Sequence, residues 1–186
     1  MTTPSGQISL DDVNTELGIS TGTQINMGAT DVRTLAGVPS GEISMADLQG
    51  KSNAQFLVAS GGSTTTSGDF KIHTFNSSGT FTVNQAGNAA GSNSVEYLVV
   101  AGGASGGGET GGGGGAGGYR SSVTGENSGG GASAESALAA PAGSYTVTVG
   151  GGGAGVGGQT NGNNGSNSVF ANITSNGGGY ASHHPA

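Results

Sequence analysis

The strongest constraint on this chain is a run of glycine that follows directly on a strand-like segment. Residues 102–118 hold twelve glycines among seventeen residues, and they come straight after the apolar run 95–100. Glycine loses more backbone freedom on folding than any other residue, so such a run is floppy unless something holds it. A further strand-like segment, 119–123, tethers its other end. A run held at both ends is typical of a displayed surface on a scaffold and is unlike the lining of an enzyme site.

The composition limits how much core the chain can build. Glycine accounts for 42 of the 186 residues, about three times its usual share. Charged residues make up only 8%, and apolar runs recur through the middle of the chain, which argues against full disorder. Hydrophobic residues, at 32%, are too few for one large core. We therefore expect a thin sandwich, with self-association or docking onto a larger body supplying further burial.

Charge and cysteine content exclude several classes of function. The net charge is −7, and the four basic residues are scattered, so no nucleic-acid partner is expected. Without cysteine the chain has neither disulfides nor thiolate metal sites. No apolar stretch approaches the length of a membrane span, so no membrane insertion is expected. The first residues lack the pattern of a signal peptide, which favours assembly inside a cell and release by lysis.

The sequence predicts no enzyme activity, no cofactor and no metal. The stretch 99–107 has the strand-then-glycine order of a nucleotide site, but more glycine follows where a helix is needed. His73 lies in an alternating strand and is interpreted as a surface residue. His183 and His184 are interpreted as part of a disordered tail, in preference to metal ligands in a trimer. The acids of the body are dispersed, with no histidine or second acid near them in sequence: Glu96, Glu109, Glu126 and Glu135.

A short motif occurs three times near the N-terminus. Its isoleucines, Ile8, Ile25 and Ile43, are 17 and 18 residues apart. Each is followed by a good helix N-cap, namely Ser9, Asn26 and Ser44. Aspartates at the third helical position, Asp12 and Asp47, complete a short capping box in two copies, and Gly18, Gly37 and Gly50 close the three copies. The motif predicts three short helices at 10–17, 27–36 and 45–50.

Helices this short must pack on one another or on a partner, because each is marginal alone in water. The module 1–51 is therefore either a small self-contained helical cap or an attachment module that docks the chain onto a larger assembly. Its few apolar residues favour attachment. The candidate docking residues are Ile8, Leu10, Val13, Leu17, Ile25, Met27, Val32, Leu35, Ile43, Met45 and Leu48.

The second domain, 52–186, has the alternation and turn residues of a β structure. Strands are predicted at 55–59, 69–75, 80–84, 95–100, 119–123, 144–149 and 168–174. A turn at 76–79 predicts a hairpin between 69–75 and 80–84, and the nearly continuous apolar run 95–100 predicts a central strand. The fold class predicted is mainly β: a small antiparallel β-sandwich with long glycine-rich loops, preceded by the module of three small helices.

The glycine tracts lie between these strands and allow two structures. They cover about 102–118, 129–131, 150–158 and 177–179. They are either mobile loops or extended polyglycine-type helices whose backbone amides bond to neighbouring segments. Both structures expose backbone donors and acceptors in place of charged groups.

Two regions of the sequence resemble proteins of tailed bacteriophages. The stretches 8–17 and 32–45 look like the opening segment of tail fibre and minor tail proteins. The body is similar to the glycine-rich domain that follows it in such proteins, at 97–103, 111–120, 143–150 and 164–170. The resemblance implies a virion structural protein of the tail fibre, tail tip or baseplate, assembled in the host cytoplasm.

The resemblance implies that residues 1–51 attach to other tail or baseplate proteins and that the body faces outward, where it could touch the host surface. A homotrimer is expected. The alternative is a host-receptor-binding adhesin whose glycine loops and aromatic residues recognise cell-surface glycans, with Tyr119, Tyr145 and Tyr180 as the contact residues. A cold-binding or silk-like secreted protein is disfavoured by the missing signal peptide and by the helical repeat.

Overall fold

The computed structural model describes residues 2–88 and 90–183, and these form two compact units. The first unit comprises Met1–Val58 and Gln85–Asn93, and the second comprises Ala59–Asn84 and Ser94–Ala186. The predicted domain boundary after residue 51 falls within the first unit. Within the described ranges, no helix has the length and apolar character needed to cross a membrane.

The first unit contains three short helices, α1 (Leu10–Leu17), α2 (Thr30–Ala36) and the 3₁₀ helix η1 (Met45–Leu48). Side-chain capping decides where α1 and η1 begin. Ser9 and Asp12 form the predicted capping box of α1, and Ser44 and Asp47 form that of η1. In each box the aspartate carboxylate accepts hydrogen bonds from the backbone N–H and from the side chain of the serine. Both bonds lower the pKa of the aspartate, and the backbone bond has the larger effect.

The predictions for the second and third helices need correction. Asn26 does not cap α2, because its side chain accepts from the N–H of Gly28 at 2.8 Å and forms a local turn instead. The helix therefore starts at Thr30, after Ala29, and has no side-chain cap. The third helix ends at Leu48, because the backbone of Gln49 is extended.

The first unit has a conventional apolar core. Val13 and Leu48 are fully buried, and Val32, Leu35 and Ala36 complete the centre. The side chain of Thr3 donates to the carbonyl of Leu48, and its N–H donates to the carbonyl of Lys51 at 2.7 Å. The start of the chain is thus tied to the end of the helical repeat.

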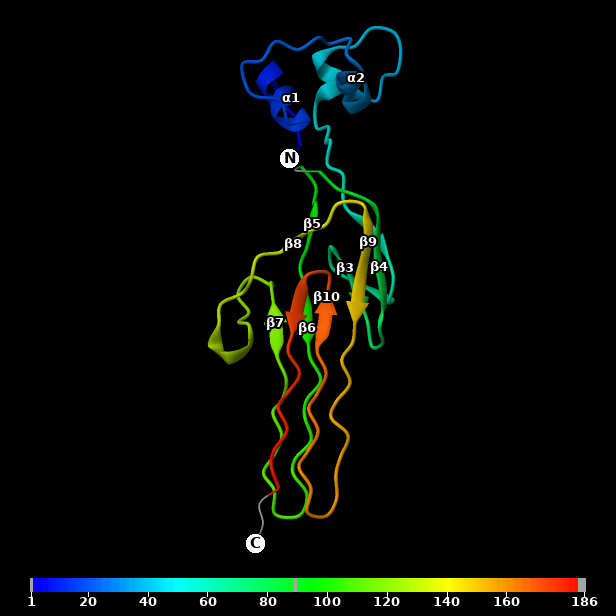
Figure 1. Cartoon of the computed structure of the whole chain (residues 1–186). Coiled ribbons are helices and arrows are strands. Elements are labelled where there is room, and N and C mark those ends of the chain that lie inside the picture. The colour runs from blue at the N-terminus through cyan, green and yellow to red at the C-terminus, as the bar shows by residue number, and fades with distance from the viewer. Residues whose placement is uncertain (1, 89, 184–186) are drawn as a thin grey trace. The chain divides into compact units, whose positions relative to one another are not determined.

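The second unit is built around an antiparallel sheet of five strands, which confirms the mainly β fold class. The strand order is β1-β4-β9-β10-β11, and Figure 1 labels β4, β9 and β10 of this sheet. Their bounds are Val58–Ser60, Gly79–Gln85, Gly143–Thr148, Ser168–Phe170 and Ile173–Ser175. The sheet is open, and among the described residues no barrel closes.

Three two-stranded ribbons accompany the sheet: β2 (Ser63–Ser67) with β3 (Phe70–Thr74), β5 (Ser94–Val95) with β8 (Leu138–Ala139), and β6 (Leu98–Val100) with β7 (Tyr119–Ser121). A 3₁₀ turn, η2 (Gly129–Gly131), lies between β7 and β8. Tyr97 and Val99 pack against Ile173 and Phe170 in the core of the second unit.

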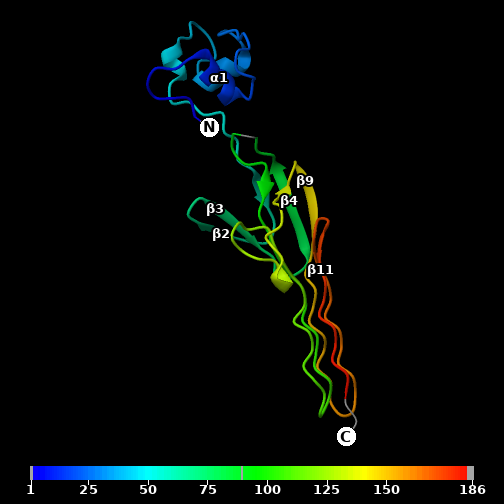
Figure 2. The same cartoon turned by 90° about the vertical axis from the view of Figure 1, so that its left-hand side faces the viewer.

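The predicted hairpin between 69–75 and 80–84 is wrong. β3 pairs with β2, whereas β4 pairs with β9 in the sheet. The sequence contains the signal for the observed hairpin: the β-branched run Ser63–Ser67 is separated from Phe70 by Gly68 and Asp69, and Gly68 has a φ of 56°. Figure 2 shows this ribbon standing away from the sheet.

The apolar run 95–100 is not one central strand. It divides into β5 and β6, and β6 pairs only with β7. Tyr97 causes part of this break, because its N–H bonds to the hydroxyl of Ser122 at 2.8 Å and not to a strand backbone. The predicted strand 168–174 also divides, since Ala171 turns the chain between β10 and β11 with a φ of 53°.

Candidate functional site: the glycine bundle

The glycine tracts pack side by side as five extended segments, which we call the glycine bundle (Figure 1). The segments are, in order, 101–108, 111–118, 149–157, 160–167 and 176–183. Of their glycines only Gly117 has a positive φ. The packed alternative therefore holds for three of the four predicted tracts, and the fourth, 129–131, forms the turn η2.

Hydrogen bonds between the segments repeat every three residues. In the first segment, one row of N–H groups donates to the second segment and the next row donates to the fourth. The first row joins Ala101, Ala104 and Gly107 to the carbonyls of Gly118, Gly115 and Gly112, and the other joins Gly102, Ser105 and Gly108 to Ser166, Asn163 and Thr160, all at 2.8–3.0 Å. Three residues per turn without internal bonds is the geometry of a polyproline II-type helix.

The fifth segment closes the bundle by contacting three others. It donates to the first segment through Gly178, whose N–H lies 2.9 Å from the carbonyl of Gly102. It accepts from the second segment, from Gly115 at 2.9 Å. It also accepts from the fourth, from Gly165 at 2.9 Å. Many backbone groups of these segments are thus satisfied by neighbouring segments.

Close backbone packing explains why many of these positions are glycine. A Cβ at Gly153 would lie 2.0 Å from the carbonyl oxygen of Asn163, and one at Gly178 would lie 2.1 Å from that of Gly115. Other glycines are not constrained in this way: a Cβ at Gly155 or Gly179 would meet nothing within 4 Å. The bundle therefore has an interior that excludes side chains and a surface that would accept them.

An asparagine ladder fixes the fifth segment against the fourth. The side-chain oxygens of Asn161, Asn164 and Asn167 accept from the N–H groups of His183, Tyr180 and Gly177, each at 2.8 Å. The three asparagines are spaced by three residues, as are their three donors. Sequence reasoning missed this ladder, although the spacing of asparagine from 161 to 167 has the period of the bundle itself.

A polar cluster lies where the bundle joins β7. Arg120 holds Glu135 through two bonds, from Nε to Oε1 at 2.7 Å and from Nη2 to Oε2 at 2.5 Å. The hydroxyl of Tyr97 also donates to Glu135, at 2.7 Å. The bonds from Arg120, and then that from Tyr97, lower the pKa of Glu135 to about 2. Burial, and after it the bond to Glu135, raises the pKa of Tyr97.

This cluster serves the structure. Arg120 also donates to the carbonyl of Thr174 at 3.1 Å, which ties β7 to β11. The remaining bond of Glu135 comes from Ser128. Because the charges neutralise one another, the cluster presents no free general base or nucleophile.

The candidate docking residues mostly form the core of the first unit. Val13, Val32, Leu35 and Leu48 are buried at its centre, and six others pack against them: Ile8, Leu17, Ile25, Met27, Ile43 and Met45. Leu10 is the exception, with 45% of its surface exposed. The docking role itself stays a prediction.

The three candidate receptor tyrosines lie on different elements. The ring of Tyr145, on β9, packs against Phe81 and Phe170 with centroids 6.3 and 6.4 Å away, so it serves the core. Tyr119, on β7, is 36% exposed, and Tyr180, in the fifth segment, is 47% exposed. The contact role of these residues is likewise a prediction.

The histidines differ from their interpretation as surface and tail residues. His73 is half-buried: its ring lies edge-on to Phe81 at 5.2 Å, and its Nδ1 lies 2.8 Å from the carbonyl of Gly61. His183 is held by Asn161 in the ladder, whereas His184 lies outside the described residues. Across the described ranges, no three His, Asp or Glu residues gather as metal ligands would.

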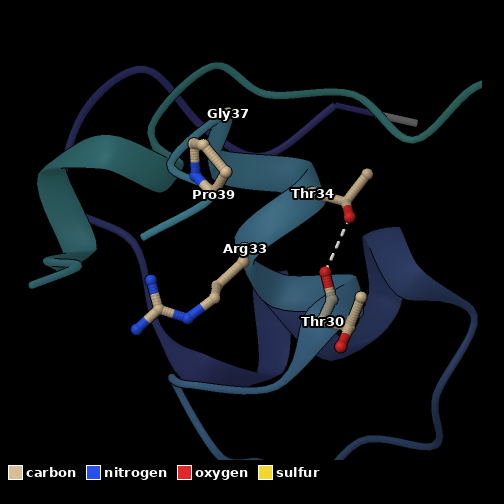
Figure 3. Close-up of a pocket in the computed structure, with 5 residues that line it drawn as sticks. All are labelled: Thr30, Arg33, Thr34, Gly37 and Pro39. Atoms are coloured by element: carbon tan, nitrogen blue, oxygen red, sulfur yellow. Dashed lines mark hydrogen bonds between the residues drawn. The ribbon is translucent and has the colours of Figure 1, made fainter. Parts of the chain in front are cut away.

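A shallow hollow of about 330 Å³ lies in the first unit, lined by Thr30, Arg33, Thr34, Gly37 and Pro39 (Figure 3). Arg33 is its one charged lining residue, but its three nitrogens donate to the carbonyls of Gly28, Val38 and Gly41. The guanidinium therefore fastens a loop and is poorly placed to bind an anion.

A family model described as Glycine-rich domain matches residues 74–186, which span most of the second unit. No curated protein and no solved structure matches the chain.

Proposed function

This chain belongs to the Glycine-rich domain family, and we propose that it is a structural component of a bacteriophage tail. In this proposal it lies in the fibre, tail tip or baseplate of the virion. The tail itself is assembled in the host cytoplasm. The first unit docks it onto other tail proteins, and the glycine-rich β domain faces outward, in reach of the host surface.

The observation that carries the proposal is the division into two separately stabilised parts. The first unit has its own apolar core around Val13 and Leu48, and the glycine bundle has its own backbone network. An attachment module and a displayed domain need this independence, because one must bind the particle while the other stays folded in solvent. The bundle is also poor in charge: its five segments contain no Asp, Glu, Lys or Arg, and Glu109 lies in the turn between the first two.

Deleting residues 1–51 tests the docking role. Particles assembled with the shortened chain are expected to lack it, whereas the full chain is incorporated. A finer variant is Leu10→Asn, because Leu10 is the candidate docking residue that the core leaves exposed. Ser20→Asn, at another exposed position, is the matched control. Normal incorporation of the shortened chain contradicts docking through this unit.

The second candidate function is host recognition by the bundle, in which the tyrosines stack on sugar rings of surface glycans. The exposure of Tyr119 and Tyr180 supports it, whereas the packing of Tyr145 argues against that residue as a contact. Cell binding by the chain, lost in Tyr180→Ala and kept in Gln159→Ala, is the expected result. Equal binding by both variants contradicts it.

A homotrimer is part of the structural proposal. Self-association would cover exposed apolar side chains of the second unit, such as Phe70 at 67% and Val100 at 54%. Light scattering on the purified chain measures the mass directly, and a monomer at micromolar concentration contradicts a trimer that forms without the tail.

A further inference from the structure

The sequence has three Asn–Gly pairs, and all three lie in the glycine bundle. They are Asn161–Gly162 and Asn164–Gly165 in the fourth segment and Asn176–Gly177 at the start of the fifth. An asparagine before glycine is chemically labile, because the glycine nitrogen can reach the side-chain carbon of the asparagine without hindrance. Asparagine is accordingly among the residues that heat-resistant proteins avoid.

In the folded bundle the nitrogen that would attack is engaged at every pair. The N–H of Gly162 donates to the carbonyl of Ala181, and that of Gly165 donates to the carbonyl of Gly178, both at 2.9 Å. The N–H of Gly177 donates to the side chain of Asn167 at 2.8 Å. Each nitrogen keeps its proton and its direction while these bonds persist.

The group that would be attacked is engaged as well at two of the pairs. The side-chain oxygens of Asn161 and Asn164 accept from the N–H groups of His183 and Tyr180, at 2.8 Å. These bonds point the amides toward the fifth segment and away from the glycine that follows each asparagine. Both restraints on these two pairs come from the fifth segment, so both are released together when it leaves.

We propose that the Asn–Gly pairs are a modification site that is closed in the folded bundle and open when the fifth segment detaches. The glycine nitrogen then bonds to the asparagine Cγ, the bond from Cγ to the side-chain nitrogen breaks, and ammonia leaves with the proton of the glycine N–H. Water opens the resulting succinimide ring to aspartate or isoaspartate. The step needs only water and involves no oxidant.

The products make the opening permanent. Isoaspartate carries the backbone through the side-chain carbon and so lengthens the path of the chain by one atom. This breaks the three-residue period that aligns the fourth segment with its neighbours. Aspartate keeps the acceptor but adds a negative charge to a stretch, 149–183, that contains no charged Asp, Glu, Lys or Arg side chain. A bundle that has once opened and reacted at Asn161 or Asn164 cannot close again as before.

The test measures modification of the full chain at mildly alkaline pH, by mass spectrometry of its peptides and by chemical detection of isoaspartate. The folded chain is expected to react at Asn161 and Asn164 at least about tenfold more slowly than the chain in denaturant, a factor that needs an opening free energy of only about 1.4 kcal/mol. Equal rates in the folded and the unfolded chain overturn the proposal.

Two neighbouring glycines give a matched pair of variants. In Gly178→Ala the new Cβ would lie 2.1 Å from the carbonyl oxygen of Gly115, so the fifth segment is displaced and the rates rise toward those of the unfolded chain. In Gly179→Ala nothing lies within 4 Å, and the rates stay those of the parent. Parent-like rates in a folded Gly178→Ala chain contradict the gating.

If the Gly178→Ala chain does not fold, a measurement on the parent chain takes its place. Amide hydrogen exchange at Gly162 and Gly165 reports detachment of the fifth segment, and it is followed alongside modification through a series of low denaturant concentrations. Modification is expected to rise in step with this exchange. Modification that rises only with global unfolding, and not with exchange at these two amides, overturns the proposal.

Discussion

The first unit and the glycine bundle bury their backbones in opposite ways. The unit places Val13, Val32 and Leu48 between its short helices and caps those helices with Ser9 and Ser44. The bundle has almost no side chains inside, and its extended segments bond to one another directly. The first unit is held by the volume of its buried apolar side chains, whereas the bundle can pack only because its interior positions carry no side chain.

The contrast teaches that sensitivity to substitution should reverse between the two regions. Removing atoms from the core of the first unit leaves a cavity, and adding atoms inside the bundle forces backbones apart. At positions that face solvent, the first unit should tolerate added atoms and the bundle should tolerate the removal of atoms.

The largest expected effect is that of Leu48→Ala in the first unit. Leu48 is fully buried, and such a truncation costs about 3 kcal/mol of unfolding free energy. Denaturant titration followed by NMR should show the first unit unfolding early while the bundle amides stay protected. Leu10→Ala, at a half-exposed position, is the control and should cost under about 0.5 kcal/mol. Simultaneous loss of both sets of signals would mean that the two regions are not independent.

Gly153→Ala should be the reverse case in the bundle. Its Cβ would lie 2.0 Å from the carbonyl oxygen of Asn163, and relief of that clash is expected to cost about 2 kcal/mol. Gly155→Ala, two residues along the same segment, has open space and should stabilise by about 0.5 kcal/mol through the unfolded state. Thermal unfolding of the two variants decides the matter, and equal melting temperatures would mean that the bundle is not closely packed.

A smaller loss is expected for Asn164→Ala. The change removes the acceptor of the Tyr180 N–H, and one such bond is worth about 1 kcal/mol. Faster amide exchange at Tyr180 should accompany the drop in stability, and Gln159→Ala, at an exposed position, serves as the control. An unchanged exchange rate at Tyr180 would show that the asparagine ladder does not hold the fifth segment.

The smallest expected effect is a pH dependence at the polar cluster. Glu135 has its pKa lowered from 4.5 to about 2, so its contribution to stability is present above pH 4.5 and is lost as the pH falls from 4.5 to 2. Its partners are partly exposed, with 37% of the Arg120 side chain accessible, so the change is modest.

Glu135→Gln should flatten this part of the profile, as measured by melting temperature against pH. The aspartates of the capping boxes, Asp12 and Asp47, change stability in the same direction within the first unit. The relevant quantity is therefore the difference between the variant and the parent chain. Parallel profiles for the two would assign the acid sensitivity to other groups.

Local signals in the sequence were sufficient for two of the three predicted N-caps and for most of the strands. Ser9 with Asp12 and Ser44 with Asp47 were identifiable because a capping box is complete within four residues. The alternation of Tyr145, Val147 and Thr146 located β9 for the same reason. These features depend on neighbours in the chain, and the sequence displays such neighbours directly.

Pairings between distant segments were not predictable in this way. The turn at 76–79 led to β3 as the predicted partner of β4, whereas the true partner, β9, lies far along the chain and no local signal links the two. The packing of the glycine tracts was left open, because glycine carries no side chain whose polarity marks an inner face. The asparagines 161, 164 and 167 do carry that period, and a search for a repeat of three would have found them.

The nearly side-chain-free interior of the bundle has a thermal consequence. Unfolding a hydrocarbon core raises the heat capacity, whereas exposing peptide groups lowers it. The bundle exposes mainly peptide groups, so its free energy should vary with temperature along a flatter curve than that of the first unit. Cooling weakens apolar cores. The glycine bundle should therefore stay folded at low temperatures at which the short helices of the first unit unfold.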